Sequence, residues 1–451
     1  MKKIIGVCLT QANSEICREF VRYLHASAKK NNSKIIIYNS VVDFTDNAYL
    51  GAKYVYYSIP YEKLSALVIL HETIFDSSLL DKIIRDAKEH NVPVIMARKY
   101  DPRCYSIIGE YEDAYTNLLK TVIKERNIKK TCYIAGRNTP EIDYDSKLRI
   151  QCYKNALEDS GLEFSLDNVE FGSYWEFPTR KVFERLMKKS SEMPDAIFCA
   201  NDIMAETIIN LLNSKGIKVP DDIYVAGFDG LECYRCSSPN ITTCREEMDV
   251  LCDTIFEIIK KHEDKTIESN AFYYGYKPIF SETCGYENEQ VKESLQSGND
   301  AFKTLRYNHA REEIAKKWFG KVLNNPTIDE FYKVIPEYVM QGFSVAMAPC
   351  EVARIINKRY HTLDEKLIVY STDGTTLQPR ADKFLAKDLV PNFDEWMKDD
   401  TVCYVTGVYV EDLCYGQIYE KGDIIDRLGY STQRHAYTII NALKICVNQD
   451  L

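Results

Sequence analysis

The sequence predicts an α/β protein in which residues 1–285 are doubly wound around parallel sheets and a separate α+β domain follows. Two observations favour this fold class. Short apolar runs alternate with helical patterns along the first region, and polar, charged sequence begins after Gly285. The predicted strands of the first region include Ile4–Cys8, Lys34–Tyr38, Leu67–Leu70, Val94–Ala97 and Thr131–Ala135.

The segment 194–230 shows most clearly how such a fold forms a binding site. Two apolar runs with the pattern of strands flank a run with helical spacing, and the three are Ala196–Cys199, Tyr224–Phe228 and Ile203–Leu212. Asn201 and Asp229 therefore lie just past the carboxyl ends of two strands. Ligands bind at that edge of open parallel α/β sheets, because strand ends leave backbone groups and polar turn residues facing a crevice. The pattern favours a ligand-binding crevice over an active site.

Five motifs occur in a fixed order along the first region. They are SIIGEYEDAYTNLL at 106–119, DSKLRIQCYKNALEDSG at 145–161, the AND turn at 200–202, KVPDDIYVAGFD at 218–229 and SSPNITTCREEMDVL at 237–251. Together they resemble the effector-binding domain of the lactose-repressor (LacI/GalR) family, and the resemblance covers residues 1–285. It implies a two-lobed, type I periplasmic-binding-protein-like fold with two doubly wound parallel sheets.

The resemblance also implies where the two lobes begin and end. In that family the chain crosses between lobes three times, which here falls at about residues 138, 244 and 276. Lobe 1 then contains residues 1–138 and 245–275, and lobe 2 contains residues 139–244 and 276–285. Two lobes joined by several hinge strands can close on a ligand.

Candidate ligand contacts follow from the same resemblance. It implies that Asp113 comes from the first lobe, whereas Arg149, Asn201 and Asp229 come from the second. A guanidinium, an amide and two carboxylates suit vicinal hydroxyls, because each hydroxyl both donates and accepts a hydrogen bond. We therefore expect a sugar-like or nucleoside-like ligand. An aromatic ring from the pair formed by Tyr174 and Trp175 is expected against an apolar ligand face, and the sequence does not decide which of the two points inward.

Each candidate also has a purely structural interpretation that stays open. Asp113 has the residue type that caps a helix start, and Arg149 could be an ordinary surface arginine. Asn201 lies in a strand-to-helix turn where asparagine is expected on structural grounds alone, and Asp229 is a turn residue as well. Taken singly, the two aromatic residues fit a core as well as a ligand platform.

The sequence departs from the family in ways that limit the transfer of function. The chain starts on the first strand of the sensor without a helix-turn-helix, so we do not expect a conventional operator-binding repressor. The net charge is -10, and no run of lysine and arginine forms a stripe that could neutralise phosphates. We expect no direct nucleic-acid contact by this chain. Cys152 replaces a family glycine and Lys147 a usual arginine, so ligand identity should not be transferred.

Residues 286–325 are predicted to form a helical connector. The segment is polar and charged, with apolar residues at helical spacing and a break near Ser297 to Asp300. Two interpretations stay open for it. It could transmit lobe motion or form a dimer contact, or it could be a helix packed flat on one domain.

Residues 326–451 are predicted to form the α+β domain. A helix precedes strands at Gly342–Ala348, Lys366–Ser371, Val402–Val410 and Tyr415–Tyr419. Turns are predicted at 372–374 and 420–422, and a closing helix at Ser431–Val447. The order of elements resembles small GAF-like or PAS-like sensory domains. The whole arrangement resembles the sensor part of bacterial signalling proteins that end in a GGDEF diguanylate cyclase or an AraC-type DNA-binding domain, neither of which is present here. We expect an output beyond Leu451 or on another protein.

Other chemistry has little support in the sequence. The 15 cysteines are scattered, and nothing resembles a signal peptide or a membrane span, which favours a reducing cytoplasm. Cys233 and Cys236 form a single CxxC without a second pair, so neither a metal site nor a cofactor is expected. No nucleotide-loop or nucleophile motif supports enzymatic activity. The leading hypothesis is a cytoplasmic, homodimeric ligand sensor, and the alternatives are a transport-type solute-binding protein and an interaction scaffold without a ligand.

Overall fold

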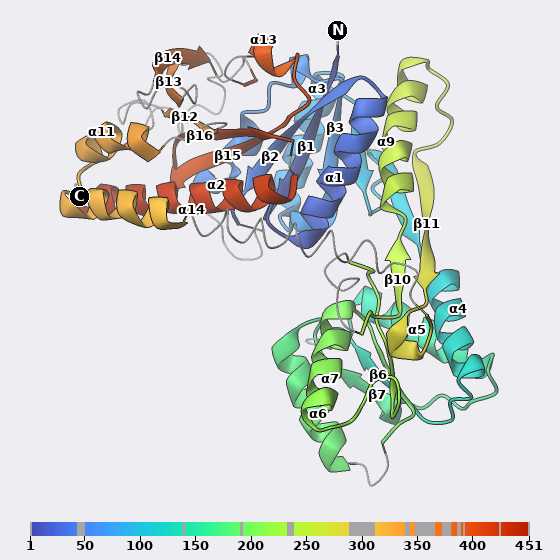
Figure 1. Ribbon diagram of the computed structural model, residues 1–451. Coiled ribbons are helices and arrows are strands. Elements are labelled where there is room, and N and C mark those ends of the chain that lie inside the picture. The colour runs from blue at the N-terminus through green and yellow to red at the C-terminus, as the bar shows by residue number, and fades with distance from the viewer. Residues whose placement is uncertain are drawn as a thin grey trace. The chain divides into compact units, whose positions relative to one another are not determined.

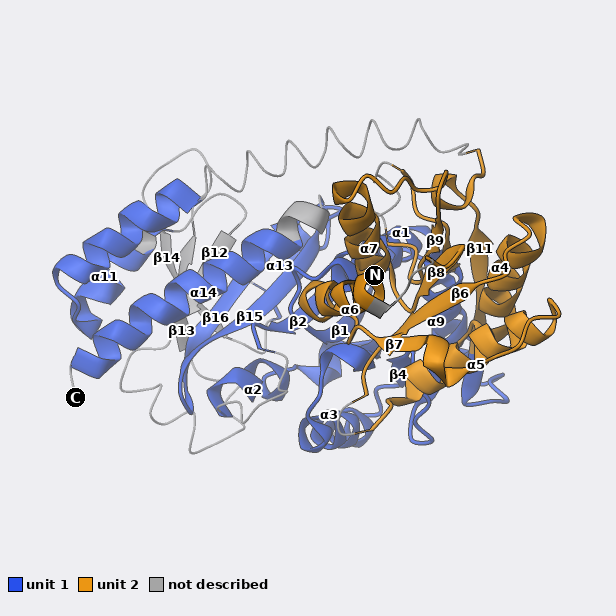
Figure 2. Ribbon diagram, turned by 90° about the horizontal axis from the view of Figure 1, so that it is seen from below, with its two compact units in different colours: residues 1–108, 248–272, 303–451 blue, residues 109–247, 273–302 orange. Residues whose placement is uncertain are grey.

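The computed structural model describes residues 2–42, 50–138, 141–189, 193–231, 239–287, 312–338, 343–347, 366–371, 380–385, 389–390, 393–423 and 425–449. The chain forms two compact units (Figure 2). Unit 1 consists of residues 1–108, 248–272 and 303–451, and unit 2 of residues 109–247 and 273–302. Within the described residues, no helix is long and apolar enough to cross a bilayer.

The amino-terminal part of unit 1 is a parallel sheet in the order β5-β4-β3-β1-β2. Figure 1 labels β1, β2 and β3 of this sheet. Its strands are β1 (Lys3–Thr10), β2 (Ser33–Ser40), β3 (Ala66–Leu70), β4 (Val94–Ala97) and β5 (Tyr105–Glu110). The helices of this part are α1 (Glu15–Lys30), α2 (Leu50–Tyr57), α3 (Ser77–Glu89) and α9 (Met248–Glu263). All residues of β2, β3 and β4 are buried. These strands therefore read as continuous apolar runs, because helices cover both faces of such a sheet.

The carboxyl-terminal segment extends the sheet of unit 1. Its elements are α11 (Ile328–Tyr338), β12 (Phe343–Met347), β13 (Lys366–Ser371), β14 (Arg380–Leu385), α13 (Phe393–Trp396), β15 (Val402–Val410), β16 (Leu413–Gly422) and α14 (Ile425–Gln449). β15 pairs in parallel with β2, and the order continues as β15-β16-β12-β13-β14 with antiparallel pairs. Strands from the first 40 residues and from the last 50 thus belong to one sheet.

This arrangement differs from the separate domain that we expected at residues 326–451. All of β15 is buried, as is all of β2, so each strand shields one edge of the other from water. Local sequence patterns carry no signal for a pairing between strands this far apart. Several smaller expectations change as well, since residues 420–422 belong to β16 and not to a turn, while β14 and α13 were not predicted. The predicted turn at 372–374 lies outside the described residues.

The predicted connector is described only in part. Residues 288–311 lie outside the described residues, and residues 312–324 form a helix. In that helix Trp318 is buried, its indole N–H donates to the Val334 carbonyl at 2.8 Å, and its ring stacks on Tyr338 of α11. The described part of the connector therefore packs on unit 1, as the second interpretation of this segment had it.

Unit 2 contains a second parallel sheet, in the order β7-β6-β8-β9. Its strands are β6 (Thr131–Ala135), β7 (Val169–Phe171), β8 (Ala196–Cys199) and β9 (Tyr224–Ala226), and its helices include α4 (Glu112–Glu125), α5 (Tyr144–Glu158), α6 (Glu176–Lys189) and α7 (Asp202–Ser214). The antiparallel strands β10 (Thr243–Glu246) and β11 (Ala271–Ile279) pair with each other. The α/β fold with two parallel sheets, expected from the sequence, is confirmed.

The chain passes between the units at residues 108–109, 247–248 and 272–273. The last two crossings lie within a few residues of the expected positions, about 244 and 276. The first differs from the expected position near 138. The reason is α4, whose apolar side, including Tyr115 and Leu119, joins the core around β6. Because α4 belongs to unit 2, Asp113 lies in unit 2 and not in the first lobe.

Candidate ligand-binding site

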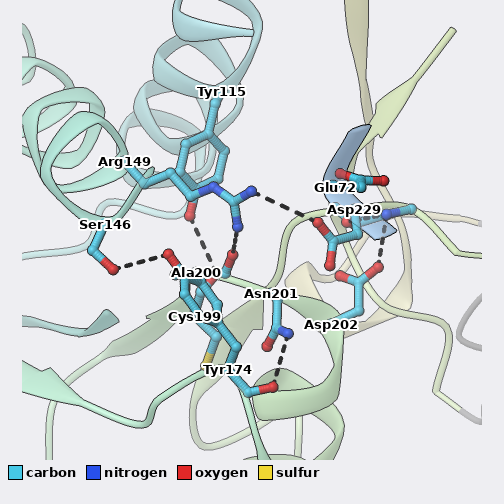
Figure 3. A network of polar contacts seen from close by, with 12 residues as sticks. Glu72, Tyr115, Ser146, Arg149, Tyr174, Cys199, Ala200, Asn201, Asp202 and Asp229 are labelled. Carbon is cyan, nitrogen blue, oxygen red and sulfur yellow. Dashed lines mark hydrogen bonds and ion pairs between the residues drawn. The ribbon is translucent and has the colours of Figure 1, made fainter. Parts of the chain in front are cut away.

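Arg149 lies at the centre of a polar cluster beside the carboxyl ends of β8 and β9 (Figure 3). It projects from α5, whose N-cap Asp143 accepts a hydrogen bond from the Ser146 amide. One terminal nitrogen of Arg149 donates to the Ala200 carbonyl, and the other lies 3.9 Å from Oδ1 of Asp229. The structure therefore brings together two candidates, Arg149 and Asp229, that are far apart in the sequence.

Aromatic rings surround the Arg149 guanidinium. Its central carbon lies 3.9 Å from the Phe228 ring centre, 5.6 Å from that of Tyr111 and 5.7 Å from that of Tyr174. Burial opposes the charge, whereas Asp229 and the tyrosines favour it, and the balance raises the pKa of Arg149 above its ordinary value. Arg149 is thus a permanent cation, although only 12% of its side chain is exposed. Rings of this kind stabilise a cation held at low solvent exposure.

The cluster also leaves hydrogen-bonding capacity unused. Among the described residues, Nε of Arg149 and the hydroxyl of Tyr111 are buried without a hydrogen-bond partner. Such buried groups cost free energy unless something bonds them. A polar ligand that accepts from Nε and also bonds the Tyr111 hydroxyl would satisfy both groups. A hydroxyl-rich or amide-bearing molecule has that chemistry.

Asp229 is presented by an unusual backbone conformation. Its φ is +109°, a region in which residues other than glycine are uncommon. A backbone hydrogen bond holds this turn, because the Asp229 amide donates to the Cys244 carbonyl at 3.1 Å. The side chain remains 27% exposed. Asp229 is therefore a positioned carboxylate that water or a ligand can reach.

Asp202, which sequence reasoning treated only as a turn residue, is fully buried beside Asp229. One of its carboxylate oxygens accepts from the Gly230 amide at 2.8 Å, and the other has no hydrogen-bond partner among the described residues. A Cβ on Gly227 would lie 2.2 Å from this second oxygen, so only glycine fits there. Burial, and secondarily the Asp229 charge, raises the pKa of Asp202 well above its ordinary value. Two features of the sequence could have indicated this buried carboxylate. They are an aspartate at the start of a predicted helix and the later motif GFDG at 227–230.

Asn201 serves as the N-cap of α7. Its side-chain oxygen accepts from the Met204 amide at 3.0 Å, and its nitrogen donates to the Tyr174 carbonyl at 3.2 Å. The residue is buried. The structural interpretation of Asn201 thus accounts for its side-chain oxygen, and a ligand contact by Asn201 stays a prediction.

We expect Asn201→Ala to lower the free energy of unfolding by about 1 kcal/mol, because the Met204 amide loses its cap. Asn201→Asp keeps an acceptor at the cap and should cost less. Urea unfolding followed by circular dichroism measures both. A loss of ligand binding in Asn201→Asp, with stability retained, would instead assign the amide nitrogen to the ligand.

The structure places the two residues of the aromatic pair in different surroundings. The Tyr174 hydroxyl bonds Ser146 at 2.8 Å and donates to Asp143 at 3.2 Å. Burial raises the pKa of Tyr174 to about 12, so its hydroxyl stays protonated at neutral pH. Trp175 is 62% exposed and therefore not a core residue. Tyr174 is the ring that contributes to the Arg149 cluster.

Asp113 is not part of this cluster in the structure. It is exposed in the first turn of α4, where the N-cap position is held by Tyr111. The N-cap role that we considered for Asp113 is not seen, and a ligand contact by Asp113 stays a prediction. Its place in the first turn of a helix favours a carboxylate for electrostatic reasons.

A second group of polar residues, missed by sequence reasoning, follows the strands of unit 1. Thr10, at the end of β1, exchanges two hydrogen bonds with Thr73, one of them at 3.1 Å from the Thr10 amide. Arg98 follows β4 with φ of +68° and forms an ion pair with Glu72. An arginine with a positive φ after a buried strand has no local sequence signature, so the sequence did not predict the role of Arg98.

Residues 123–270 match the family described as a periplasmic binding protein-like domain. Over this part of the chain, the protein is similar to that family. Within that match lie α5, α7 and the turn that carries Asp229. The LacI/GalR resemblance seen in the motifs is supported by curated relatives.

One relative is the catabolite control protein A of Priestia megaterium, 24% identical over 196 residues, which are 43% of this chain and 58% of that protein. Another is the HTH-type transcriptional repressor PurR of Aliivibrio fischeri, 30% identical over 173 residues, which are 38% of this chain and 50% of that protein. The chain thus spans only about half the length of the curated relatives that it matches.

Solved structures show the same fold. The transcription regulator CcpA of Lactococcus lactis has a TM-score of 0.50 and 20% identity, covering 63% of this chain and 99% of that one. A CelR–cellobiose complex has a TM-score of 0.50 and 14% identity, covering 62% of this chain and 85% of that one. At these identities the likeness concerns the fold alone. It agrees with the family match over residues 123–270 and with the two parallel sheets.

Proposed function

We propose that this chain is a sensor that binds a small polar ligand at the Arg149–Asp229 cluster and takes part in the regulation of transcription. The observation that carries the proposal is the buried guanidinium of Arg149, which is ringed by aromatic side chains and keeps an unsatisfied N–H. A protein that needed Arg149 only for stability would be expected to bond every donor. The names of the curated relatives, a catabolite control protein and a transcriptional repressor, support the regulatory part.

The ligand class follows from the chemistry of the cluster. Arg149 offers donors in a planar fork, and Asp229 offers acceptors that remain partly exposed. Neighbouring hydroxyls on one molecule can accept from the first and donate to the second. The aromatic faces of Tyr111, Tyr174 and Phe228 would favour a ligand with an apolar face. A carbohydrate-like or nucleoside-like molecule has these properties.

Thermal unfolding of the full chain tests this proposal. The panel should contain glucose, cellobiose, glucose 6-phosphate, adenosine and arginine. A ligand at a hundred times its Kd stabilises the folded state by about 2.7 kcal/mol and raises Tm. We expect at least one sugar or nucleoside to do so. No shift with any sugar or nucleoside would favour the interaction scaffold, and a shift with arginine alone would contradict the ligand class.

Asp229→Asn is expected to weaken binding of that compound by about ten- to a hundredfold, because a charged acceptor contributes about 1.5–3 kcal/mol. Asp167→Asn is the matched control, since Asp167 is an exposed carboxylate elsewhere in unit 2. Titration calorimetry measures both affinities. Equal binding by Asp229→Asn and the wild type would place the ligand elsewhere.

We propose a cytoplasmic homodimer that has no enzymatic activity of its own and does not touch nucleic acid directly. The GAF-like or PAS-like character of the carboxyl-terminal segment, and a diguanylate cyclase or AraC-type output, stay predictions. The transport-type solute-binding protein remains the alternative.

A further inference from the structure

The carboxyl-terminal segment contacts the ends of β1 and β2 through one buried asparagine, Asn39. Its side-chain oxygen accepts from the Ala12 amide at 3.2 Å, and its nitrogen donates to the Thr406 hydroxyl at 3.2 Å. Thr406 stands opposite Asn39 in the pairing of β15 with β2, and both residues are fully buried. Asn39 thus connects the β1–α1 loop directly to β15.

Helix α14 contacts the β1–α1 loop and also the loop that follows β2, which begins at Val41. The Gln433 side-chain amide donates to the Val41 carbonyl at 2.9 Å, and the Tyr437 hydroxyl donates to it at 3.2 Å. At Gly429 the helix lies directly on the β1–α1 loop, since a Cβ there would be 2.4 Å from the Ala12 carbonyl oxygen. α14 therefore contacts both loops. At Gly429 the contact leaves no room for an added methyl group.

Electrostatic and aromatic contact adds to this interface. The Arg18 guanidinium of α1 lies 4.5 Å from the Tyr430 ring centre. The loop itself is tightly defined, because Gln11 has φ of +51° and its amide donates to the Ser40 carbonyl at 2.9 Å. A change in the conformation of residues 11–14 would have to alter the packing of α14.

These loops follow the carboxyl ends of parallel strands, which is the edge where open α/β sheets bind ligands. Thr10, Thr73 and Arg98 lie at that same edge of unit 1. The carboxyl-terminal segment therefore touches the edge of unit 1 where a ligand would be expected. The path through residues 286–325 is not needed for this contact.

We propose that the carboxyl-terminal segment is the receiver of the signal, and that a change in residues 11–14 passes to β15 through Asn39 and to α14 through the contact of Gly429 with Ala12. The ligand part of this statement rests on the proposed function. The coupling itself is carried by contacts within unit 1 alone. It has the physical form that coupling needs, namely a contiguous set of buried hydrogen bonds and packed backbone.

Hydrogen exchange of the full chain without ligand tests the coupling. Gly429→Ala inserts a methyl group against the Ala12 carbonyl. We expect at least about tenfold faster exchange in residues 429–437 and also in residues 11–14, while β6 and β8 in unit 2 are unchanged. Faster exchange confined to α14 would overturn the proposal. Thr438→Ala is the control. Within the described part of the chain, the Thr438 hydroxyl bonds only the Arg434 carbonyl of the same helix, so the variant should leave residues 11–14 unaffected.

A second, milder variant decides the matter if Gly429→Ala does not fold. Thr406→Val keeps the shape of the side chain but removes the hydroxyl that accepts from Asn39. Exchange at Ala12 and in residues 11–14 should rise severalfold, because the asparagine loses one of its two anchors. Unchanged exchange at Ala12 would show that Asn39 does not link the loop to β15.

A third arm adds adenosine or cellobiose at millimolar concentration. A compound that slows exchange in residues 11–14 should also slow it in 429–437, and the second effect should be weaker in Thr406→Val, which keeps only the contact of Gly429 with Ala12. Protection in unit 2 with both segments unchanged would overturn the receiver role while leaving the proposed function intact. If neither compound protects any segment, the proposed function is weakened, whereas the ligand-free variants still decide the coupling.

Discussion

Asp202→Asn is expected to stabilise unit 2 at alkaline pH and to abolish a loss of stability that the wild-type chain shows as pH rises. The Asp202 carboxyl is fully buried, and burial, followed by the Asp229 charge, raises its pKa well above the ordinary value of 3.8. Hydrogen bonds from Thr243 and from the amides of Gly230 and Leu231 oppose this shift without cancelling it.

The sign of the effect follows from proton binding. Between the unfolded pKa, near 4, and the raised folded pKa, the folded state holds one more proton than the unfolded state. Stability therefore falls as pH rises through this window, by up to about 1.4 kcal/mol per pH unit. Below pH 4 both states are protonated, and the full contribution is present. Asparagine is neutral at every pH and can still accept from the Gly230 amide. The stability of the Asp202→Asn variant should therefore not fall with rising pH in this window.

Hydrogen exchange of residues 196–212, corrected for intrinsic rates, measures the stability of unit 2 at pH 5, 6.5 and 8. The wild type should lose protection along this series, whereas Asp202→Asn should keep it. Asp202→Ala separates charge from hydrogen bonding, because it leaves the Gly230 amide without this acceptor and should be less protected at every pH. Parallel slopes for wild type and Asp202→Asn would mean that Asp202 does not carry the pH dependence.

Local sequence pattern was sufficient for most of the individual strands. β4, β6, β8 and β15 begin and end where the apolar runs do, because a strand that is buried on both faces has nearly continuous apolar sequence. The pairing of β15 with β2 was not predictable in this way. Each of the two strands fits many partners, and only the assembled sheet shows which edges are free.

The candidate site was predictable to a similar extent. Arg149 and Asp229 were recognised by motif, and the fold places a terminal guanidinium nitrogen of Arg149 3.9 Å from Oδ1 of Asp229. Asp202 and Tyr111 were not recognised, because their importance comes from burial and from unsatisfied hydrogen bonds, which sequence does not show. Asp113 was assigned to the wrong lobe since a strand-then-helix pattern does not say which sheet the helix covers.

Replacement of Arg149 is expected to have the largest effect on ligand binding. Arg149→Lys keeps the charge but has one nitrogen in place of three, so it cannot donate to the Ala200 carbonyl, pair with Asp229 and also present an N–H at the position of the unpartnered Nε. We expect binding of the stabilising sugar or nucleoside to weaken about a hundredfold or more. Arg185→Lys is the control, since Arg185 pairs with Glu170 at 2.8 Å on the surface of the same unit.

Truncation of Arg149 should affect folding as well as binding. Arg149→Met leaves the Asp229 carboxylate beside buried Asp202 without its cation, and we expect the free energy of unfolding to fall by about 1–3 kcal/mol. The double variant Arg149→Met with Asp229→Asn removes both charges. It should recover most of that stability, because removing a charge pair together costs less than breaking it.

The two readouts then separate the roles of Arg149. If the double variant is as stable as the wild type but does not bind, Arg149 and Asp229 are retained for the ligand and not for the fold. If it still binds, as measured by titration calorimetry, the ligand does not depend on the guanidinium and the site lies elsewhere. Every variant keeps the three aromatic rings whose centres lie 3.9–5.7 Å from the guanidinium carbon of Arg149 in the wild type. A loss of binding can therefore be assigned to the lost hydrogen bonds and charge.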